Sequence, residues 1–385
     1  MAKKTIYLDH ASSTPMDPVV AGVFSNALEL YANPSGLHEE GIFARQKIES
    51  ARKEIAKLIN ARSAEIIFTS SGTESNNLAL RGICRSFKNP HIVTTNIEHP
   101  SIIETCHALS EEGIEVTFVP VEPSGLIDPK KIKDALKPNT CLVSVAMANN
   151  EIGTIEPLDE ISKIIRHWRA RQNTQTPYFH TDAVQAINYL EINVEKLGVD
   201  LLTFNGSKIY GPRGIGALYK KTNIPLKPIL FGGGQEKNLR PGTENTPAIL
   251  GLAKALEIAI LGREKEAARL TKLREYFFSE LEKLNLKTII NGDRKMRLPN
   301  NVNVSIGDLT GDIMVIELSA KGVTASSKSA CKEGIDSESY VINALGQAGK
   351  NSLRFSLGRS TTKASVDAAI SALKDIFAKY VKIKR

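Results

Sequence analysis

Lys208 is the residue of this sequence whose surroundings point most directly to chemistry. It follows an apolar run at residues 200–204 and lies within the glycine-rich stretch 205–216. Burying an ammonium group is costly, and desolvation lowers the pKa of a lysine so that its amine can form a Schiff base. The nearby glycines would let the backbone approach a bulky ligand closely. The alternative is a lysine that simply reaches solvent from a glycine-rich turn.

Asp182 ends the preceding apolar run, residues 178–181, and lies 26 positions before Lys208. Ligands of parallel sheets sit at the carboxyl ends of the strands, so the acid and the amine would face one crevice. A carboxylate there could hold the pyridinium proton of pyridoxal phosphate and keep the ring an electron sink. An aspartate that caps a helix is the alternative.

A third polar motif, Ser70–Asn77, follows the apolar run 65–69 and opens a helical pattern. A helix that starts after a turn of small residues presents unpaired N–H groups and its positive dipole end, which together bind an anion such as phosphate. An ordinary helix cap formed by Ser71 or Thr73 would give the same pattern.

Two further turns follow apolar runs in the same way. His99 comes after residues 91–96 and precedes a helical pattern, and Asn149–Gly153 comes after residues 141–147. A structural histidine and asparagines that merely form a turn are the alternatives.

Cys331 lies in a small, polar loop between Lys328 and Lys332. Neighbouring ammonium groups favour the thiolate, which is the nucleophilic form of cysteine. The alternative is an incidental exposed thiol. The other cysteines, Cys84, Cys106 and Cys141, fall on helix or strand patterns and are expected to be buried as small apolar residues.

The elements that position these residues form an alternating pattern. Short runs rich in Val, Ile, Phe and Thr alternate with helical patterns such as Leu158, Ile161, Ile165 and Trp168. This alternation predicts a mostly parallel sheet covered by helices. The expected strands span residues 65–69, 91–96, 115–119, 141–147, 178–181, 200–204 and 216–219.

The last third of the chain has a different pattern. A long helical region at residues 246–284, interrupted near Gly262, precedes two expected strands at 301–305 and 313–318. A final helix places Val366, Ile370, Leu373 and Phe377 on one face. We expect a large domain over residues 16–255 and a smaller domain built from residues 1–15 and 256–385, with a mobile loop at about 322–336 around Cys331.

Composition excludes several classes of protein. The 385 residues suffice for two domains, and 50 basic minus 42 acidic residues give a net charge of +8. The basic residues are scattered, so no direct nucleic-acid partner is expected. No apolar stretch is long enough for a membrane span, and residues 1–7 contain no apolar signal region, so a cytoplasmic protein is expected. The four cysteines form no C-x-x-C pair, so no metal site is expected.

Taken in order, these motifs resemble those of the cysteine desulfurases of iron–sulfur cluster assembly, members of the class V aminotransferase family of fold type I. The resemblance runs from Tyr7–His10 to Arg354–Arg359, nearly the whole chain. Three intermediate stretches also match: Asn33–His38, Gly232–Glu236 and Arg240–Asn245.

The resemblance implies an α/β fold of the type I pyridoxal-phosphate-dependent transferases, with a mostly parallel seven-stranded sheet flanked by helices and a smaller α+β C-terminal domain. It also implies a homodimer that binds pyridoxal 5'-phosphate. Lys208 would carry the cofactor, His99 would stack on its ring and move protons, and Cys331 would accept sulfur. The other implied cofactor-binding residues are Gly72, Thr73, Asn150, Asp182, Gln185, Asn205 and Ser207, with Thr243 reaching the phosphate from the second subunit. Asn150 and Arg354 would bind the substrate, and a guanidinium suits its carboxylate.

The implied activity is conversion of L-cysteine to L-alanine, with the sulfur left as a persulfide on Cys331 and passed to an iron–sulfur scaffold or a tRNA-thiolation protein. Two departures bear on it: the family usually has Ser-x-His-Lys where this chain has Asn205–Lys208, and a loop glycine is replaced by Lys328. The alternatives are a selenocysteine lyase, another class V enzyme, or a degenerate non-catalytic assembly subunit.

Overall fold

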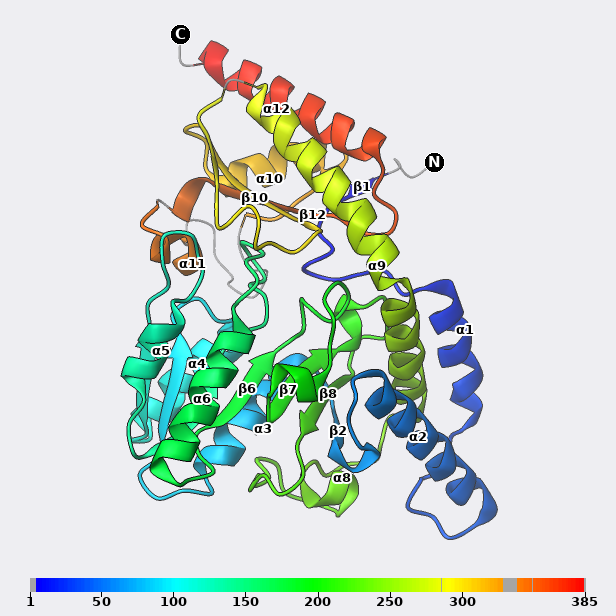
Figure 1. Ribbon diagram of the computed structural model, residues 1–385. Coiled ribbons are helices and arrows are strands. Elements are labelled where there is room, and N and C mark those ends of the chain that lie inside the picture. Colours follow the sequence, from blue (N-terminus) through cyan, green and yellow to red (C-terminus); the bar gives the residue numbers. More distant parts are fainter. Residues whose placement is uncertain (1–4, 285, 328–337, 348, 384–385) are drawn as a thin grey trace.

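The computed structural model describes residues 5–284, 286–327, 338–347 and 349–383 (Figure 1). Its centre is a seven-stranded sheet with the strand order β2-β8-β7-β6-β5-β3-β4. Strands β4, β3, β5, β6 and β7 are parallel, and β8 runs antiparallel to both of its neighbours. The strands are β2 (Ile66–Thr69), β3 (His91–Thr95), β4 (Glu115–Val119), β5 (Thr140–Ser144), β6 (Tyr178–Asp182), β7 (Leu201–Asn205) and β8 (Gly216–Lys220).

All seven strands lie where the apolar runs predicted them, and the predicted mostly parallel, helix-covered sheet is confirmed. Alternate residues of one strand pack on opposite faces: Ile66 and Phe68 join one apolar cluster, whereas Ile67 joins the other. Because both faces are buried, strands such as β2 and β5 carry apolar residues on both faces rather than in alternation.

Helices cover both faces of this sheet (Figure 1). Residues of α3 and α4 belong to the cluster on one face, and residues of α2, α6 and α9 belong to the cluster on the other. The helices of this part are α1 (Pro18–Asn26), α2 (Glu39–Leu58), α3 (Gly72–Cys84), α4 (Pro100–Glu111), α5 (Pro129–Ala135), α6 (Leu158–Gln172), α7 (Val194–Leu197), α8 (Gln235–Asn238) and α9 (Thr246–Glu282).

Helix α9 leads from the large sheet to a second, smaller group of elements (Figure 1). An antiparallel sheet with the order β12-β10-β9 lies there, and β1 of the N-terminal arm pairs in parallel with β11 in a separate two-stranded sheet. The elements are β1 (Ile6–Tyr7), β9 (Thr288–Ile290), β10 (Asn301–Ile306), α10 (Gly311–Ala320), β11 (Val323–Thr324), α11 (Tyr340–Ala344), β12 (Ser352–Ser356) and α12 (Lys363–Ile383).

Two sequence-based expectations for this part are wrong. Residues 313–318, predicted as a strand, form helix α10, in which Met314 and Leu318 lie one turn apart and are buried. The predicted interruption near Gly262 does not exist, because α9 runs unbroken through that position. The domain boundary at residue 255 falls inside the same helix, so it stays a prediction.

Three cysteines are buried in the cluster between the sheet and helices α3 and α4. Cys84, Cys106 and Cys141 are free thiols, as their sequence patterns predicted. Burial raises the pKa of the Cys106 thiol. A hydrogen bond with Cys84, together with burial, raises the pKa of the Cys141 thiol. These three thiols are therefore poor nucleophiles.

Among the described ranges, no helix has both the length and the apolar character needed to cross a bilayer.

Candidate active site

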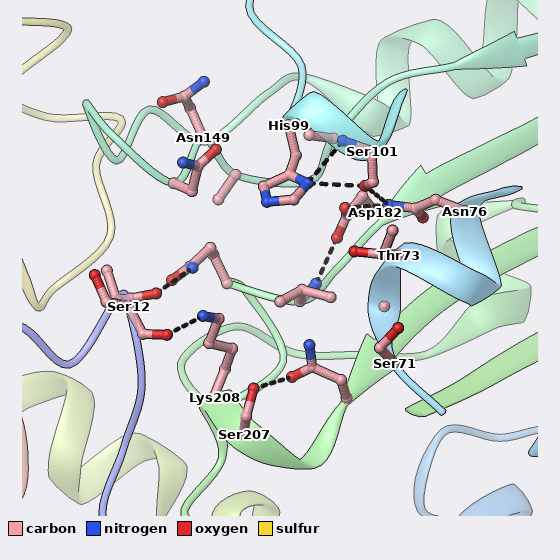
Figure 2. Close-up of a pocket in the computed structure, with 18 of the residues that line it drawn as sticks. Ser12, Ser71, Thr73, Asn76, His99, Ser101, Asn149, Asp182, Ser207 and Lys208 are labelled. Carbon is pink, nitrogen blue, oxygen red and sulfur yellow. Dashed lines mark hydrogen bonds between the residues drawn. The ribbon is translucent and has the colours of Figure 1, made fainter. Parts of the chain in front are cut away.

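A cavity of about 260 Å³ lies at the carboxyl ends of the central strands (Figure 2). The start of α3, the turns after β3, β5, β6 and β7, the N-terminal arm and β12 all contribute to its wall. The residues predicted for the site that line it are Gly72, Thr73, His99, Asn150, Asp182, Gln185, Asn205, Ser207, Lys208 and Arg354. Segments spread over most of the chain thus converge on one space.

Lys208 and Asp182 come from adjacent strand ends, as expected from their spacing. Strand β6, which ends at Asp182, pairs in parallel with β7, and Lys208 closes the short helical turn after β7. The Lys208 Nζ donates a hydrogen bond to the backbone carbonyl of Ser12 in the N-terminal arm. Lys208 and His99 extend into the cavity from opposite sides (Figure 2).

Asp182 is held as a hydrogen-bond acceptor at both oxygens. Its Oδ2 accepts from Asn76 Nδ2 at 2.7 Å, and its Oδ1 accepts from the backbone N–H of Val184 at 2.9 Å. The side chain is only 7% exposed. These two donors fix the plane of the carboxylate, which is what a partner for a ring N–H requires.

His99 has its tautomer set by the helix that it caps. The backbone N–H of Ser101, in the first turn of α4, lies 3.1 Å from His99 Nδ1. A backbone N–H can only donate, so Nδ1 is an acceptor and the hydrogen of the neutral ring lies on Nε2. The Ser101 hydroxyl, 2.8 Å from the same Nδ1, also accepts from Asn76 at 2.8 Å. A continuous chain of side-chain hydrogen bonds therefore links Asp182 to His99.

The turn that opens α3 keeps space free at the floor of the cavity. Ser71 caps the helix, with its Oγ accepting from the Glu74 N–H at 3.1 Å. A Cβ on Gly72 would lie 3.0 Å from Val184 Cγ2 and 3.2 Å from Asn205 Nδ2, so a larger residue would crowd this cradle. Helix N–H groups and the amide of Asn205 are donors of the kind that bind a phosphate.

Asn205 and Ser207, the two replacements within the family's Ser-x-His-Lys pattern, both line this cavity and contact each other. The Ser207 hydroxyl donates to Asn205 Oδ1 at 3.3 Å. An amine, a carboxylate, an imidazole and phosphate donors around one cavity match in kind the groups of pyridoxal phosphate.

Arg354, on β12, forms the opposite wall and is 2% exposed. Its Nη1 donates to the Asn150 carbonyl at 2.8 Å, and its Nη2 donates to Asp9 Oδ1 at 3.0 Å and to Ser12 Oγ at 2.8 Å. Its Nε has no hydrogen-bond partner among the described residues. Gln185 binds the same arm through the Ala11 carbonyl at 3.0 Å.

Glu98 is a buried carboxyl directly behind this site. It accepts hydrogen bonds from the Ala146 N–H at 3.0 Å and from the Thr95 hydroxyl at 2.7 Å. Burial raises the pKa of Glu98 to about 8 despite these two donors, and the charge of Asp182 adds to the rise. The carboxyl thus holds its proton near neutral pH.

One predicted site residue, Thr243, does not line this cavity. Thr243 is exposed and lines a separate pocket with Ser70 and Arg240. Its predicted role is to reach the cavity of a second subunit, and that stays a prediction. Cys331 and Lys328 lie outside the described residues.

Sequence reasoning missed four residues that contact the predicted ones. Asn76 and Ser101 connect Asp182 with His99, and Asp9 and Ser12 bind Arg354. Asn76 lies four positions after Gly72 on the same helix face, so its spacing could have indicated it. The arm residues carry no local signal, because their partner lies more than 340 positions away.

Comparisons with known proteins place these observations in a family. The family described as aminotransferase class-V matches residues 6–369. A protein named cysteine desulfurase IscS from Dictyoglomus turgidum is 44% identical over 383 residues, covering 98% of this chain and 95% of that protein. A solved structure titled NifS-like protein superimposes with a TM-score of 0.90 at 33% identity, covering 97% of this chain and 99% of that one. Another, titled SspA in complex with cysteine, has a TM-score of 0.77 at 33% identity, covering 91% and 98%.

Proposed function

Because this chain belongs to the class V aminotransferase family, we propose that it is a pyridoxal-phosphate-dependent cysteine desulfurase. The reaction converts L-cysteine to L-alanine and leaves the sulfur as a persulfide on Cys331. The observation that carries the proposal is the convergence of Lys208, Asp182, His99 and Arg354 on one cavity. Relatives named cysteine desulfurase that match nearly the whole chain support the choice of substrate.

Bound pyridoxal phosphate supplies an aldehyde that joins to amines and a protonated ring that takes up the electron pair of a breaking Cα–H bond. Lys208 is the residue to hold it covalently, and Asp182 lies at the neighbouring strand end to bind the ring nitrogen. His99 would face the ring, with Asn150 and Gln185 beside its phenolic oxygen. The phosphate would bind Gly72, Thr73, Asn205 and Ser207.

The remaining residues act on the substrate. Arg354 would bind its carboxylate, and Asn150, whose carbonyl fixes Arg354 Nη1, would line the same place. The Lys208 amine, once released from the cofactor, would take the Cα proton, and the His99 Nε2–H can donate to a group in the cavity. The Cys331 thiolate would then take the sulfur.

Thr243 and an exposed apolar surface support a homodimer. Thr243 lies outside its own cavity, and within residues 28–43 Tyr31 and Leu37 are each 88% exposed and Leu28 and Phe43 are also exposed. Large apolar side chains grouped on a surface are typical of interaction sites.

The persulfide would pass to an acceptor protein, either an iron–sulfur scaffold or a tRNA-thiolation protein. Three free thiols fit a reducing compartment such as the cytoplasm.

Lys208→Ala tests the cofactor assignment. The purified variant should lack the visible absorption band of a lysine-bound cofactor, because no other lysine of the described residues lines the cavity. The band is read from the absorption spectrum beside that of the wild type. A band of wild-type intensity in the variant contradicts the assignment.

Cys331→Ala tests the sulfur acceptor. The variant should keep the absorption band and lose alanine formation from L-cysteine, since capture of the sulfur needs the thiolate. Alanine and sulfide are measured in the same reaction. Sulfide release at the wild-type rate excludes the proposed role of Cys331.

A further inference from the structure

The Arg354 guanidinium already holds a carboxylate. Asp9 Oδ1 lies 3.0 Å from Nη2, and Ser12 Oγ lies 2.8 Å from the same nitrogen. The Asn150 carbonyl lies 2.8 Å from Nη1. Arg354 is almost fully buried, so its charge needs a partner inside the protein. Asp9 is that partner.

A substrate carboxylate would need the nitrogen that Asp9 occupies. A guanidinium binds a carboxylate as a fork through two nitrogens that share an open edge. Its open edges are Nε with Nη2 and Nη1 with Nη2, because Cδ blocks the third. Both open edges include Nη2, and the two hydrogens of Nη2 bind Asp9 and Ser12. A forked substrate carboxylate must therefore displace at least one of them.

Asp9 is the group that can give way. Its side chain is 20% exposed, whereas that of Arg354 is 2% exposed. Arg354 is held from both sides, since its backbone pairs with Asn303 on β10 and with Ser326. Among the described residues, the other hydrogen-bond partner of the Asp9 side chain is the nearby Ser12 hydroxyl at 2.8 Å. Repulsion between two carboxylates on one guanidinium also favours the departure of Asp9.

We propose that Asp9 is an internal competitor that takes the place of the substrate carboxylate on Arg354 and thereby sets the affinity for amino-acid substrates. The inference rests on the proposed function, in which Arg354 binds that carboxylate. Asp9 makes the binding of an amino acid an exchange of one carboxylate for another. The exchange keeps Arg354 paired in both states and weakens the affinity for substrate and product alike.

Asp9→Asn tests this directly. Asparagine keeps the size and the Oδ1 acceptor of the side chain and removes its charge, so the competitor becomes weaker. We expect the KM for L-cysteine to fall by roughly fivefold, which corresponds to about 1 kcal/mol. The dissociation constant of the product L-alanine, measured by calorimetry on the holoenzyme, should fall by a similar factor. If this variant does not fold, Asp9→Ser removes the same charge.

Asp17→Asn is the matched control. Asp17 also lies in the N-terminal segment and binds a C-terminal arginine, with Oδ2 at 2.6 Å from Arg359 Nη1, but neither residue lines the cavity. Asparagine can still cap α1, as Asp17 does by accepting from the Val19 N–H. Its KM and its affinity for L-alanine should equal those of the wild type.

An unchanged or raised KM together with unchanged or weaker L-alanine binding in Asp9→Asn overturns the proposal, because Asp9 would then only orient Arg354. An equal gain in Asp17→Asn also overturns it, because the effect would not be local to the cavity. Calorimetry with L-alanine separates this failure from failure of the proposed function. A wild type that forms no alanine from L-cysteine contradicts the function, whereas the binding comparison still decides the role of Asp9.

Discussion

The two sides of the cavity are built in different ways. On the sheet side, Asp182, Asn76, Ser101 and His99 bind one another in a chain whose links are 2.7–2.8 Å long, behind which Glu98 is buried. On the arm side, the residue predicted to bind the substrate is held by the N-terminal arm: Arg354 donates hydrogen bonds to Asp9 and Ser12.

This difference teaches how one cavity serves two kinds of ligand. The sheet side is fixed before any ligand arrives, which suits a cofactor that stays bound. The partners on the arm side are replaceable, which suits a substrate that enters and leaves at every turnover. Changes on the sheet side should therefore affect stability and chemistry, and changes on the arm side should affect affinity.

Glu98→Gln gives the largest expected effect, on the pH dependence of stability. Burial raises the pKa of Glu98 from 4.5 to about 8 in the folded protein, so between these values the folded state binds more protons than the unfolded state. The stability contributed by the protonated carboxyl is complete below pH 4.5 and is lost as the pH rises through 8. The wild-type free energy of unfolding should fall with pH by at most about 1.4 kcal/mol per unit from this group.

The neutral amide of the Glu98→Gln variant cannot titrate, so this slope should vanish in the variant. Thermal unfolding of both proteins at pH 5, 6.5 and 8 measures the difference. Parallel profiles for the two proteins would show that the sheet side is not held by a protonated Glu98.

Asn76→Ala should have the next largest effect, on catalysis. The change removes the donor at 2.7 Å from Asp182 Oδ2 and breaks the link to Ser101. Loss of a hydrogen bond to a charged group is worth about 1.5–3 kcal/mol, so kcat should fall roughly 10- to 100-fold. The pH midpoint of the cofactor absorption band should also shift, which a purely structural defect would not cause.

Asn77→Ala is the matched control for this variant. Asn77 is the next residue of α3, and its side chain donates to the Thr73 carbonyl at 3.0 Å outside the chain of hydrogen bonds. The control should keep kcat within about twofold of the wild type, a change smaller than one weak hydrogen bond. Equal losses in both variants would mean that α3 as a whole, rather than Asn76, supports Asp182.

Ser12→Ala should have the smallest effect, and it tests which partner of Arg354 on the arm side competes with the substrate. It removes a neutral acceptor from Arg354 Nη2 but leaves Asp9 in place. The hydroxyl carries no charge, so its loss removes less competition at the guanidinium than loss of the Asp9 carboxylate, and the KM for L-cysteine should fall less than in Asp9→Asn. A larger fall in KM for Ser12→Ala would make the hydroxyl, not the charge, the competitor.

The sheet side was predictable from sequence because it obeys a local rule. Each functional residue follows a buried strand, and the ends of parallel strands meet at one edge, so positions such as Asp182 and Lys208 could be placed together. The chain of hydrogen bonds that links Asp182 to His99 was not predicted, because it depends on the rotamers of Asn76 and Ser101.

The arm side could not be predicted in the same way. The contact of Asp9 with Arg354 joins residues 345 positions apart, and it depends on how β12 and the arm pack. Helix α10 was predicted as a strand because residues 313–316 are continuously apolar. Apolar Ile316 made the segment look like a strand buried on both faces, although its side chain is 64% exposed. Met314 and Leu318 lie one turn apart and are both buried, which is the pattern of a helix.

Three buried thiols between the sheet and helices α3 and α4 make it simple to count the accessible thiols of this protein with a chemical reagent. An aromatic disulfide reagent added to the native chain cannot reach Cys84, Cys106 or Cys141, so any colour that it releases comes from Cys331 alone. The same reagent in denaturant counts four thiols. The difference between the two readings therefore counts the thiols that the fold shields, without a single substitution.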